Sequence, residues 1–479
     1  MKMTLSRTFT LLATGAGLGL LAVGLLAQQP TQPPPTSSTS STSSPGPPQQ
    51  PSEIELTISG EAGAAPRFAV PDFVALPSGD GRPADAETAE AARRIAEVLW
   101  DDLNFEREFA LIPRDTYSSI PVATSMFSVP FDRWLEMNAD GVVAGTVQKT
   151  DAGIRVEVRL FNVRTRQSAF GQEYTGPIAN RRVYAHTIAD DIHRQQRGLR
   201  GVARTKLTFN SDRSGERMTG TIENRGVREV FISDYDGENQ RQVTTNRSLN
   251  INSTWSPDGR SIAYASYRRG PPNIFVANIY QGTSEELTKD TSNNFLPVFS
   301  PDGTRVAFAS TRDGSGNTEI YVMNRNGSNV RRVTNHPAAD TTPTWSPSGA
   351  QIAFTSDRGS GPQIYIMSAD GLGAPQRISP EAYADRPTWS PSPYNEIAYS
   401  ARTGPGNDIK VIDLATRTVR QLTFGEGTNE SPSWAANGRH MAFMSTRAGK
   451  AQVFTLDRTG KNLKQITRTG NNYQPDWSK

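Results

Sequence analysis

Apolar runs and turn residues alternate in one repeating order from Lys206 to the end of the chain. Each repeat opens with an aromatic residue and a turn, as in Trp255-Ser-Pro-Asp-Gly and Phe299-Ser-Pro-Asp-Gly, and then enters a run such as Ile262-Ala-Tyr-Ala. Proline sets φ for the turn and Asp-Gly tolerates the reversal. We therefore expect the segments on either side of each turn to pair as a β-hairpin.

The spacing of the aromatic markers gives the architecture. Successive markers lie 44, 46, 44, 45 and 43 residues apart, which is the length of one four-stranded propeller blade. Six markers predict a mainly β fold, with a six-bladed β-propeller over residues 201–479. The markers are Trp255, Phe299, Trp345, Trp389, Trp434 and Trp477.

Two further strand series complete each repeat. Runs such as Ile320-Tyr-Val-Met are almost continuously apolar, as expected of strands covered on both faces. Runs such as Arg331-Arg-Val-Thr are short and polar, which suits an outer edge. The first repeat lacks a Pro-x-Trp strand, whereas Gln474-Pro-Asp-Trp477 has no strands after it. We predict that this last segment enters the first blade and closes the ring.

The aromatic markers have two interpretations, wedges packed between blades or platforms that stack on a sugar. Identical placement in every repeat favours wedges. The residues just before each Pro-x-Trp strand differ between repeats, and these segments should ring one mouth of the central channel. That mouth is the expected partner site, and its candidate residues are Asn293, Phe295, Leu296, Thr341, Asp385 and Glu430.

Residues 53–200 show a different periodicity, which predicts a small α/β domain. Apolar residues recur at helical spacing in two segments, Glu87 to Leu103 and Arg181 to Gln196, the second with Val183, Ile188 and Ile192 on its apolar side. Strands are expected at Arg67–Phe73, Asp140–Val147, Gly153–Val163 and Gln167–Tyr174.

The N-terminus indicates export. Lys2 and Arg7 precede an apolar run from Thr8 to Ala27, which is typical of a secretory signal but is also long enough for an uncleaved anchor. Residues 28–52 are almost entirely Pro, Ser, Thr and Gln, a composition that predicts a disordered tether. We therefore expect a periplasmic protein with no membrane span once residues 1–27 are cleaved.

The composition of the chain disfavours several kinds of ligand and reaction. The 51 basic and 48 acidic residues nearly cancel, which does not favour nucleic acid, and the chain has no cysteine. His186, Asp190 and His193 would share one helix face as a conceivable metal site, but a packed helix face explains them better. No nucleophile and base constellation is present. We expect no catalytic residues, metal or cofactor, and a monomer.

Four motifs lie in the first domain and at its entry into the propeller. They are Ala139-Asp-Gly-Val-Val-Ala-Gly-Thr-Val, Val158-Arg-Leu-Phe-Asn-Val, Ala185-His-Thr-Ile-Ala-Asp-Asp-Ile-His and Gly201-Val-Ala-Arg-Thr-Lys-Leu. They are more specific than the propeller repeats, which also occur in propellers of prolyl-oligopeptidase-type enzymes. Together, the motifs of both domains resemble the TolB family of the Tol-Pal envelope system.

The resemblance implies a non-enzymatic periplasmic adaptor that supports outer-membrane integrity and constriction at division. It implies that the peptidoglycan-associated lipoprotein (Pal) docks at the channel mouth. It also implies that TolA binds a short N-terminal segment, matched here by Glu53, Ile54, Leu56 and Ile58.

Two features depart from the family pattern. The TolA-binding segment begins the mature chain in the family but follows a tether here, and Ser253 replaces the usual proline before Trp255. A carbohydrate-binding or sensory propeller, or a propeller-associated hydrolase or lyase, remains the alternative.

Overall fold

The computed structural model describes residues 57–59, 63–218, 226–314 and 316–479. The predicted signal or anchor, the tether and most of the proposed TolA-binding segment lie outside these residues. In the part of the chain that is described, no helix has the length and apolar character needed to cross a membrane.

The first domain is built on one mixed sheet. Its strands follow the order β3-β1-β4-β5-β6, and β2 also pairs with β4. Strands β1 and β2 run parallel to β4, while β4, β5 and β6 form an antiparallel meander. The strand bounds are β1 Arg67–Ala69, β2 Val74–Leu76, β3 Ala110–Leu111, β4 Gly141–Thr150, β5 Gly153–Asn162 and β6 Ser168–Gly176.

The single strand expected at Arg67–Phe73 is wrong in extent. Strand β1 ends at Ala69, and β2 begins at Val74. Pro71 lies between them and has no N–H to donate to a ladder, which is consistent with the interruption. The periodicity analysis also missed β3, and the helix α2 described next.

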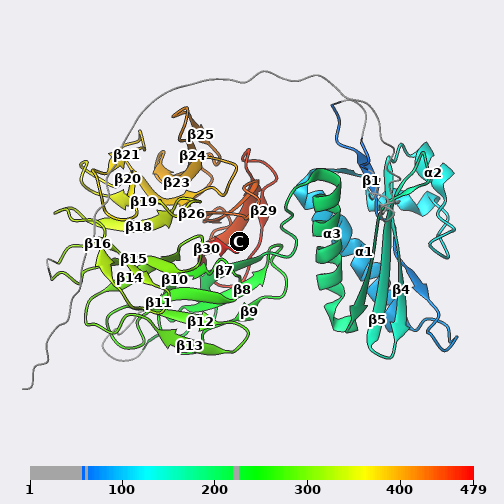
Figure 1. The fold of residues 1–479 in the computed structure, drawn as a ribbon, viewed down its shortest axis with the longest axis horizontal. Helices are drawn as coiled ribbons and strands as arrows, with labels where there is room; N and C mark the ends of the chain where they lie inside the picture. Colours follow the sequence, from blue (N-terminus) through cyan, green and yellow to red (C-terminus); the bar gives the residue numbers. More distant parts are fainter. Residues whose placement is uncertain (1–56, 60–62, 219–225, 315) are drawn as a thin grey trace, which may run out of the picture. The chain divides into compact units, whose positions relative to one another are not determined.

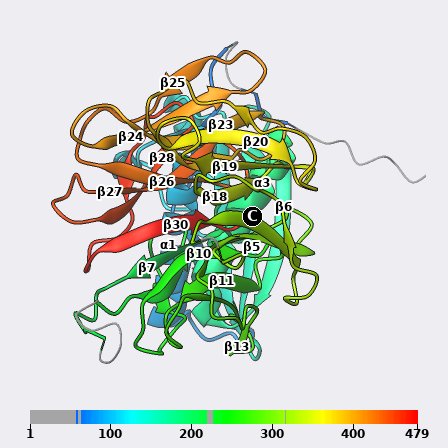
Figure 2. The same cartoon turned by 90° about the vertical axis from the view of Figure 1, so that its left-hand side faces the viewer.

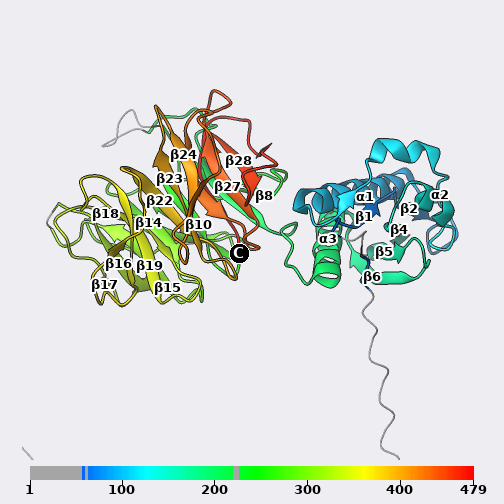
Figure 3. The same cartoon turned by 90° about the horizontal axis from the view of Figure 1, so that it is seen from above.

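Two long helices cover one face of this sheet, and a short helix lies on the other side (Figures 1 and 3). The Asp85 side chain caps α1 by accepting the N–H of Thr88 at 2.8 Å, and Gly198 ends α3 in a left-handed conformation. Val183 is 54% exposed, so its assignment to the apolar side of α3 is wrong. The helices are α1 Ala86–Glu106, α2 Phe131–Glu136 and α3 Arg181–Arg197, with 3-10 turns η1 Arg114–Ser119 and η2 Ile178–Asn180.

The second region consists of six four-stranded antiparallel sheets, which confirms the six-bladed propeller. Each blade after the first takes four consecutive strands. Blades two and three contain β10 Asn250–Trp255, β11 Ser261–Ser266, β12 Asn273–Asn278, β13 Thr283–Glu286, β14 Asn294–Phe299, β15 Arg305–Ser310, β16 Glu319–Asn324 and β17 Arg331–Arg332. Blades four to six contain β18 Asp340–Trp345, β19 Gln351–Ser356, β20 Gln363–Ser368, β21 Gln376–Arg377, β22 Ala384–Trp389, β23 Glu396–Arg402, β24 Asn407–Asp413, β25 Val419–Gln421, β26 Asn429–Trp434, β27 His440–Ser445, β28 Gln452–Asp457 and β29 Lys464–Gln465.

The first blade joins the two ends of the repeat region. Its order is β30-β7-β8-β9, so the last strand is its innermost one. Trp477 pairs with Leu207 and Asn472 pairs with Ser211; Figure 2 shows the red β30 beside the green β7. The predicted closure of the ring is confirmed. The strands are β7 Lys206–Ser211, β8 Glu229–Asp234, β9 Arg241–Gln242 and β30 Asn472–Trp477.

The six aromatic markers are wedges. Trp389 is the most exposed of them at 7%, and Trp477 is fully buried. Trp345, for example, packs with Ile352 of its own blade and Ala307 of the preceding one. Because the rings are buried, they offer no platform for a sugar.

A second repeated device was not predicted, and we call it the arginine clamp: Arg213, Arg312, Arg358 and Arg447. Each is the arginine of a Ser-x-Arg sequence whose serine is the last residue of the second strand of its blade. Arg358 bonds the buried Asp340 at 2.7 Å and lies 5.4 Å from the centre of the Phe354 ring. The clamp therefore ties the first residue of an inner strand to the aromatic side chains beside it.

Candidate functional site

Each inner strand carries a bulge at the channel. We number the six residues of strands β10, β14, β18, β22, β26 and β30 from one to six; in every one of them the ladder register shifts between positions two and five. Position three has a left-handed backbone in all six strands. Bulges re-aim side chains and are frequent beside binding sites. The residues are Asn252, Leu296, Thr342, Arg386, Ser431 and Gln474, with φ of 55°, 56°, 46°, 56°, 55° and 52°.

These backbones are costly for most side chains. Left-handed φ costs about 1–2 kcal/mol for a residue other than glycine, and asparagine tolerates it best. Leu296, Thr342 and Arg386 nevertheless adopt it. Strain that persists in six equivalent places is imposed by the blade architecture, and it fixes the backbone of each position whatever its side chain.

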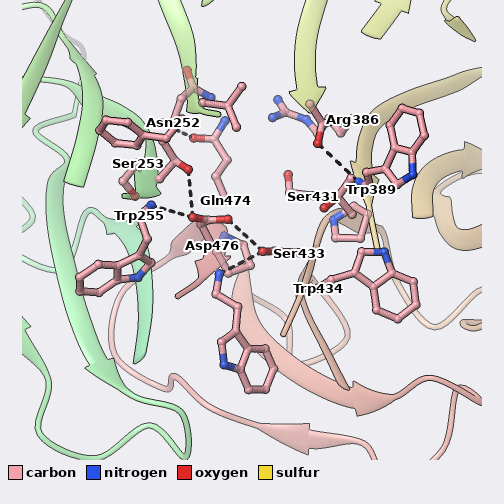
Figure 4. A pocket seen from close by; sticks show the side chains of 18 of the residues that line it. Asn252, Ser253, Trp255, Arg386, Trp389, Ser431, Ser433, Trp434, Gln474 and Asp476 are labelled. Atoms are coloured by element: carbon pink, nitrogen blue, oxygen red, sulfur yellow. Dashed lines mark hydrogen bonds between the residues drawn. The ribbon is translucent and has the colours of Figure 1, made fainter. Parts of the chain in front are cut away.

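The bulged strands surround a cavity of about 160 Å³, shown in Figure 4. All six position-three residues line it, together with the position-five residues below them. Position five is an uncharged residue in five strands and an acid in β30. These residues are Thr254, Val298, Thr344, Thr388, Ser433 and Asp476.

Asp476 is the acidic residue among those that line the cavity. Its carboxylate accepts the N–H of Trp255 at 2.8 Å and the hydroxyls of Thr254 and Ser433, each at 3.0 Å (Figure 4). Burial raises the pKa of Asp476 despite these hydrogen bonds. Asp476 thus links blades one, two and six, so its hydrogen bonds help to hold the wall of the cavity together. Sequence reasoning missed it, although it is the one acid at position five.

The predicted mouth residues do not all reach the cavity. Leu296 lines it, whereas Asn293, Phe295, Thr341, Asp385 and Glu430 do not. Asn293 is exposed, and its backbone N–H donates to the Thr311 hydroxyl at 3.1 Å. The other four occupy position two and are half-buried.

The two acids at position two already have partners. Asp385 accepts the Arg386 N–H at 2.7 Å and the Thr355 hydroxyl at 2.9 Å. Glu430 accepts the amide of Asn407 at 2.7 Å. Blade three places the apolar Phe295 and Leu296 at the mouth, while blades five and six place the charged Asp385, Arg386 and Glu430 there. Arg386 was not among the residues predicted for the mouth.

The described part of the proposed TolA-binding segment is held by the first domain. Ile58 is 1% exposed, and its N–H donates to the Gln196 side chain at 2.9 Å. Glu53, Ile54 and Leu56 lie outside the described residues. The role of the segment stays a prediction.

The two histidines of α3 contact other protein groups that hold the fold together. His186 bonds Asp102 of α1 at 2.7 Å, and Asp102 accepts the hydroxyl of Tyr235 from blade one at 2.7 Å. Burial opposes protonation of His186, but the Asp102 carboxylate outweighs it and raises the pKa to about 9. His193 is buried, which lowers its pKa to about 4, and it contacts the Ala189 carbonyl.

Residues 55–479 form a single compact unit. Within it, the Tyr235–Asp102 hydrogen bond is one of two buried polar contacts between the first domain and the propeller that we describe. Glu106 of α1, 4% exposed, pairs with Arg439 of blade six at 2.5 Å. Within the described residues, no group of three or more histidine, cysteine, aspartate and glutamate side chains is arranged to hold a metal ion.

Comparison with known proteins places this fold. Residues 195–479 match the family model of the TolB beta propeller domain, and residues 54–169 match that of the TolB amino-terminal domain. The chain is similar to the Tol-Pal system protein TolB of Pseudomonas syringae pv. tomato, at 31% identity over 154 residues. It is also similar to that of Jannaschia sp., at 32% identity over 145 residues.

Those alignments cover 32% and 30% of this chain, and they span about a third of the length of the two curated relatives, 33% and 30%. Among solved structures, TolB of Acinetobacter baumannii superposes with a TM-score of 0.71 at 24% identity. That match covers 87% of this chain and 97% of the other, and it supports the fold. Because the propeller model alone matches more than half of the chain, with the amino-terminal model ahead of it, the protein belongs to the TolB family.

Proposed function

We propose that the protein is a non-enzymatic periplasmic adaptor of the Tol-Pal system. It binds the peptidoglycan-associated lipoprotein at the channel mouth and TolA through residues 53–58, and so supports outer-membrane integrity and constriction at cell division. Membership of the TolB family supports the assignment to this system and the absence of catalysis. The observation that carries the docking site is the mouth itself, where six equivalent backbones present six different side chains.

The chemistry of the mouth suits a protein partner. Phe295 and Leu296 offer apolar contact on one side, and Asp385, Arg386 and Glu430 offer charges on the other. Interfaces of this kind draw most of their energy from a few central residues, each worth about 1–4 kcal/mol on truncation. Leu296 is the central apolar candidate because it lines the cavity.

Mouth variants test this proposal. The variant Asn293→Lys, Leu296→Arg, Thr341→Glu should weaken lipoprotein binding at least about tenfold in calorimetry. The backbone at Leu296 should tolerate arginine, since Arg386 adopts the same conformation in blade five. The control Leu372→Arg, Leu463→Arg adds charge at exposed leucines, 71% and 43% accessible, in turns that precede outer strands. A folded mouth variant that binds as tightly as the control would exclude the mouth as the docking site.

A deletion tests the TolA segment separately. Removing residues 53–58 should abolish TolA binding in a pull-down, whereas removing residues 28–33 shortens the tether equally and should leave it intact. Lipoprotein binding should survive both deletions. Because Ile58 is buried, its contact with TolA requires the segment to leave the first domain. Equal TolA capture by both deletions would remove this segment from the proposal.

A further inference from the structure

One of the six position-three residues of the channel carries a charge. Arg386 lines the cavity (Figure 4), and its side chain is 30% exposed, so an incoming group can reach it. Two further charged residues line the cavity, Asp476 and Lys479, and their opposite charges attract each other. No lining residue offsets Arg386 in this way. The uncharged position-three residues are Asn252, Leu296, Thr342, Ser431 and Gln474.

The guanidinium of Arg386 has unused hydrogen-bond donors. Its ion pair joins Nε to the Oδ2 atom of Asp385 across 3.8 Å, which is too long for a hydrogen bond. The hydrogen bonds that Arg386 donates to described residues come from its backbone N–H, which reaches Asp385 and the Thr355 hydroxyl. Because a guanidinium carries five N–H groups, several donors are left for a group from outside the chain.

The arginine clamp shows by contrast how this fold satisfies a structural arginine. Arg358 donates to both carboxylate oxygens of Asp340, at 3.0 and 2.7 Å. Its guanidinium also lies 5.4 Å from the centre of the Phe354 ring and 5.1 Å from that of Tyr365. Among the residues that the structure describes, the Arg386 guanidinium has neither a hydrogen bond nor a ring contact of this kind. Arg386 is therefore not explained by a structural role.

The acids at the mouth are already held by other donors. The Oδ1 atom of Asp385 accepts the Arg386 N–H and the Thr355 hydroxyl, and Glu430 accepts the Asn407 amide. Neither acid lines the cavity. A negative group that passes these two residues therefore meets the guanidinium.

The site is arranged before a partner arrives. The bulge fixes the backbone of Arg386 at φ 56°, and the short bond from its N–H to Asp385 holds it there. The cavity of about 160 Å³ is similar in size to one of about 150 Å³ that holds a single benzene molecule. It can therefore take one side chain of a docked protein. A carboxylate matches a guanidinium best, because it can accept two parallel N–H bonds.

We propose that Arg386 binds the carboxylate of an aspartate or glutamate side chain that the docked lipoprotein inserts into the cavity. The carboxylate accepts N–H groups on the part of the guanidinium that Asp385 does not approach. This inference rests on the proposed docking of the lipoprotein at the mouth, and it names the group that enters.

The first test removes the charge from Arg386. Arg386→Gln should weaken binding of the lipoprotein's soluble domain at least about tenfold in calorimetry. Glutamine suits this backbone, since Gln474 adopts φ 52° at position three of β30. The matched control is Arg417→Gln, which should bind as wild type. Arg417 is also in blade five and has φ 63°, but it is exposed in the turn between β24 and β25, away from the cavity.

A double-mutant cycle then identifies the carboxylate. Each acidic residue of the lipoprotein's soluble domain is replaced in turn, Asp→Asn or Glu→Gln, and each variant is titrated against wild type and Arg386→Gln. One replacement should weaken binding to wild type at least about tenfold, yet weaken binding to Arg386→Gln less than about twofold. Added salt should also weaken wild-type binding more than that of Arg386→Gln.

Three results would overturn the proposal. Arg386→Gln could bind within about twofold of wild type, Arg417→Gln could lose as much affinity as Arg386→Gln, or every acid replacement could act independently of Arg386. The triple mouth variant separates this inference from the docking proposal. If that variant loses binding while Arg386→Gln does not, docking stands and the carboxylate contact fails. If both bind as wild type, the docking site fails and the contact fails with it.

Discussion

The inner strands of the propeller combine two sets of positions that behave in opposite ways. Position six is tryptophan in five strands and phenylalanine in one, and all six rings are buried. Position three is a different residue in every strand, on a backbone that hardly changes. Side chains at position six pack between blades, so their shape is constrained. Side chains at position three enter the channel, so they can vary without altering the scaffold that presents them.

Removing the closing strand should have the largest effect on stability, because the closed ring of all six blades depends on it. Deletion of Gln474–Lys479 takes Trp477 from blade one and leaves the edge of β7 unpaired. We expect loss of cooperative thermal unfolding of the propeller by calorimetry. Removal of Lys479 alone leaves β30 and Trp477 in place and should have a much smaller effect. An unaltered melting profile after the longer deletion would contradict the role of β30.

Removing a single wedge side chain should destabilise the protein less than deleting the closing strand does. It should destabilise the protein more than substituting any mouth residue. Trp345→Ala opens a cavity between blades three and four and should lower the free energy of unfolding by about 3–5 kcal/mol. Urea denaturation measures this. A loss below about 1 kcal/mol would mean that the wedges do not hold the blades together.

Breaking the arginine clamp should lower the free energy of unfolding about as much as removing a wedge. Arg358→Met keeps the stem of the side chain but leaves the fully buried Asp340 without its cation. Removing one partner of a buried ion pair costs about 3–5 kcal/mol. The double variant Arg358→Met, Asp340→Asn should recover part of the loss in urea denaturation. If the double variant is no more stable than Arg358→Met, the pairing argument fails.

The link between blade one and the first domain should respond to pH. The Asp102 carboxylate raises the pKa of His186 from 6.5 to about 9. This stabilisation is therefore complete below pH 6.5 and is lost as pH rises through about 9; it amounts to about 3 kcal/mol. His186→Gln should remove it, so the stability difference between wild type and variant should shrink between pH 6.5 and 9.5. A constant difference would show that His186 is already neutral in the folded protein throughout this pH range.

The smallest stability effect should come from the mouth. Arg386→Met has the same chemistry as Arg358→Met, but Arg386 is half-buried and its ion pair with Asp385 spans 3.8 Å. We expect a change below about 1 kcal/mol in urea denaturation. A loss comparable to that of Arg358→Met would show that position three also holds the fold together. Position three would then no longer differ from position six in its role.

The periodic part of the fold was predictable because one blade repeats six times. Blade number, the wedge positions and the closing strand all follow from counting strands. The arginine clamp escaped prediction because it joins residues from neighbouring segments, such as Arg358, Asp340 and Phe354, whose contact is visible only in three dimensions. Repeated Ser-x-Arg was the available signal.

The non-repeating domain was less predictable. Its strands β1 and β2 are three residues each, too short to show alternation, and Pro71 between them was the one local warning. At the mouth, sequence variation identified segments that border the cavity but not which side chains enter it. The bulge decides that, because it turns position three inward in place of position two.

Ring closure also determines when the propeller can finish folding during synthesis. A chain made from its N-terminus exposes β7 long before β30 exists, since Ser211 waits for Asn472. At about 5–20 residues per second, synthesis of the intervening chain takes roughly 15–50 s. During that time the inner edge of β7 has no partner strand, so we expect blade one to complete its sheet only after residues 472–477 have been made.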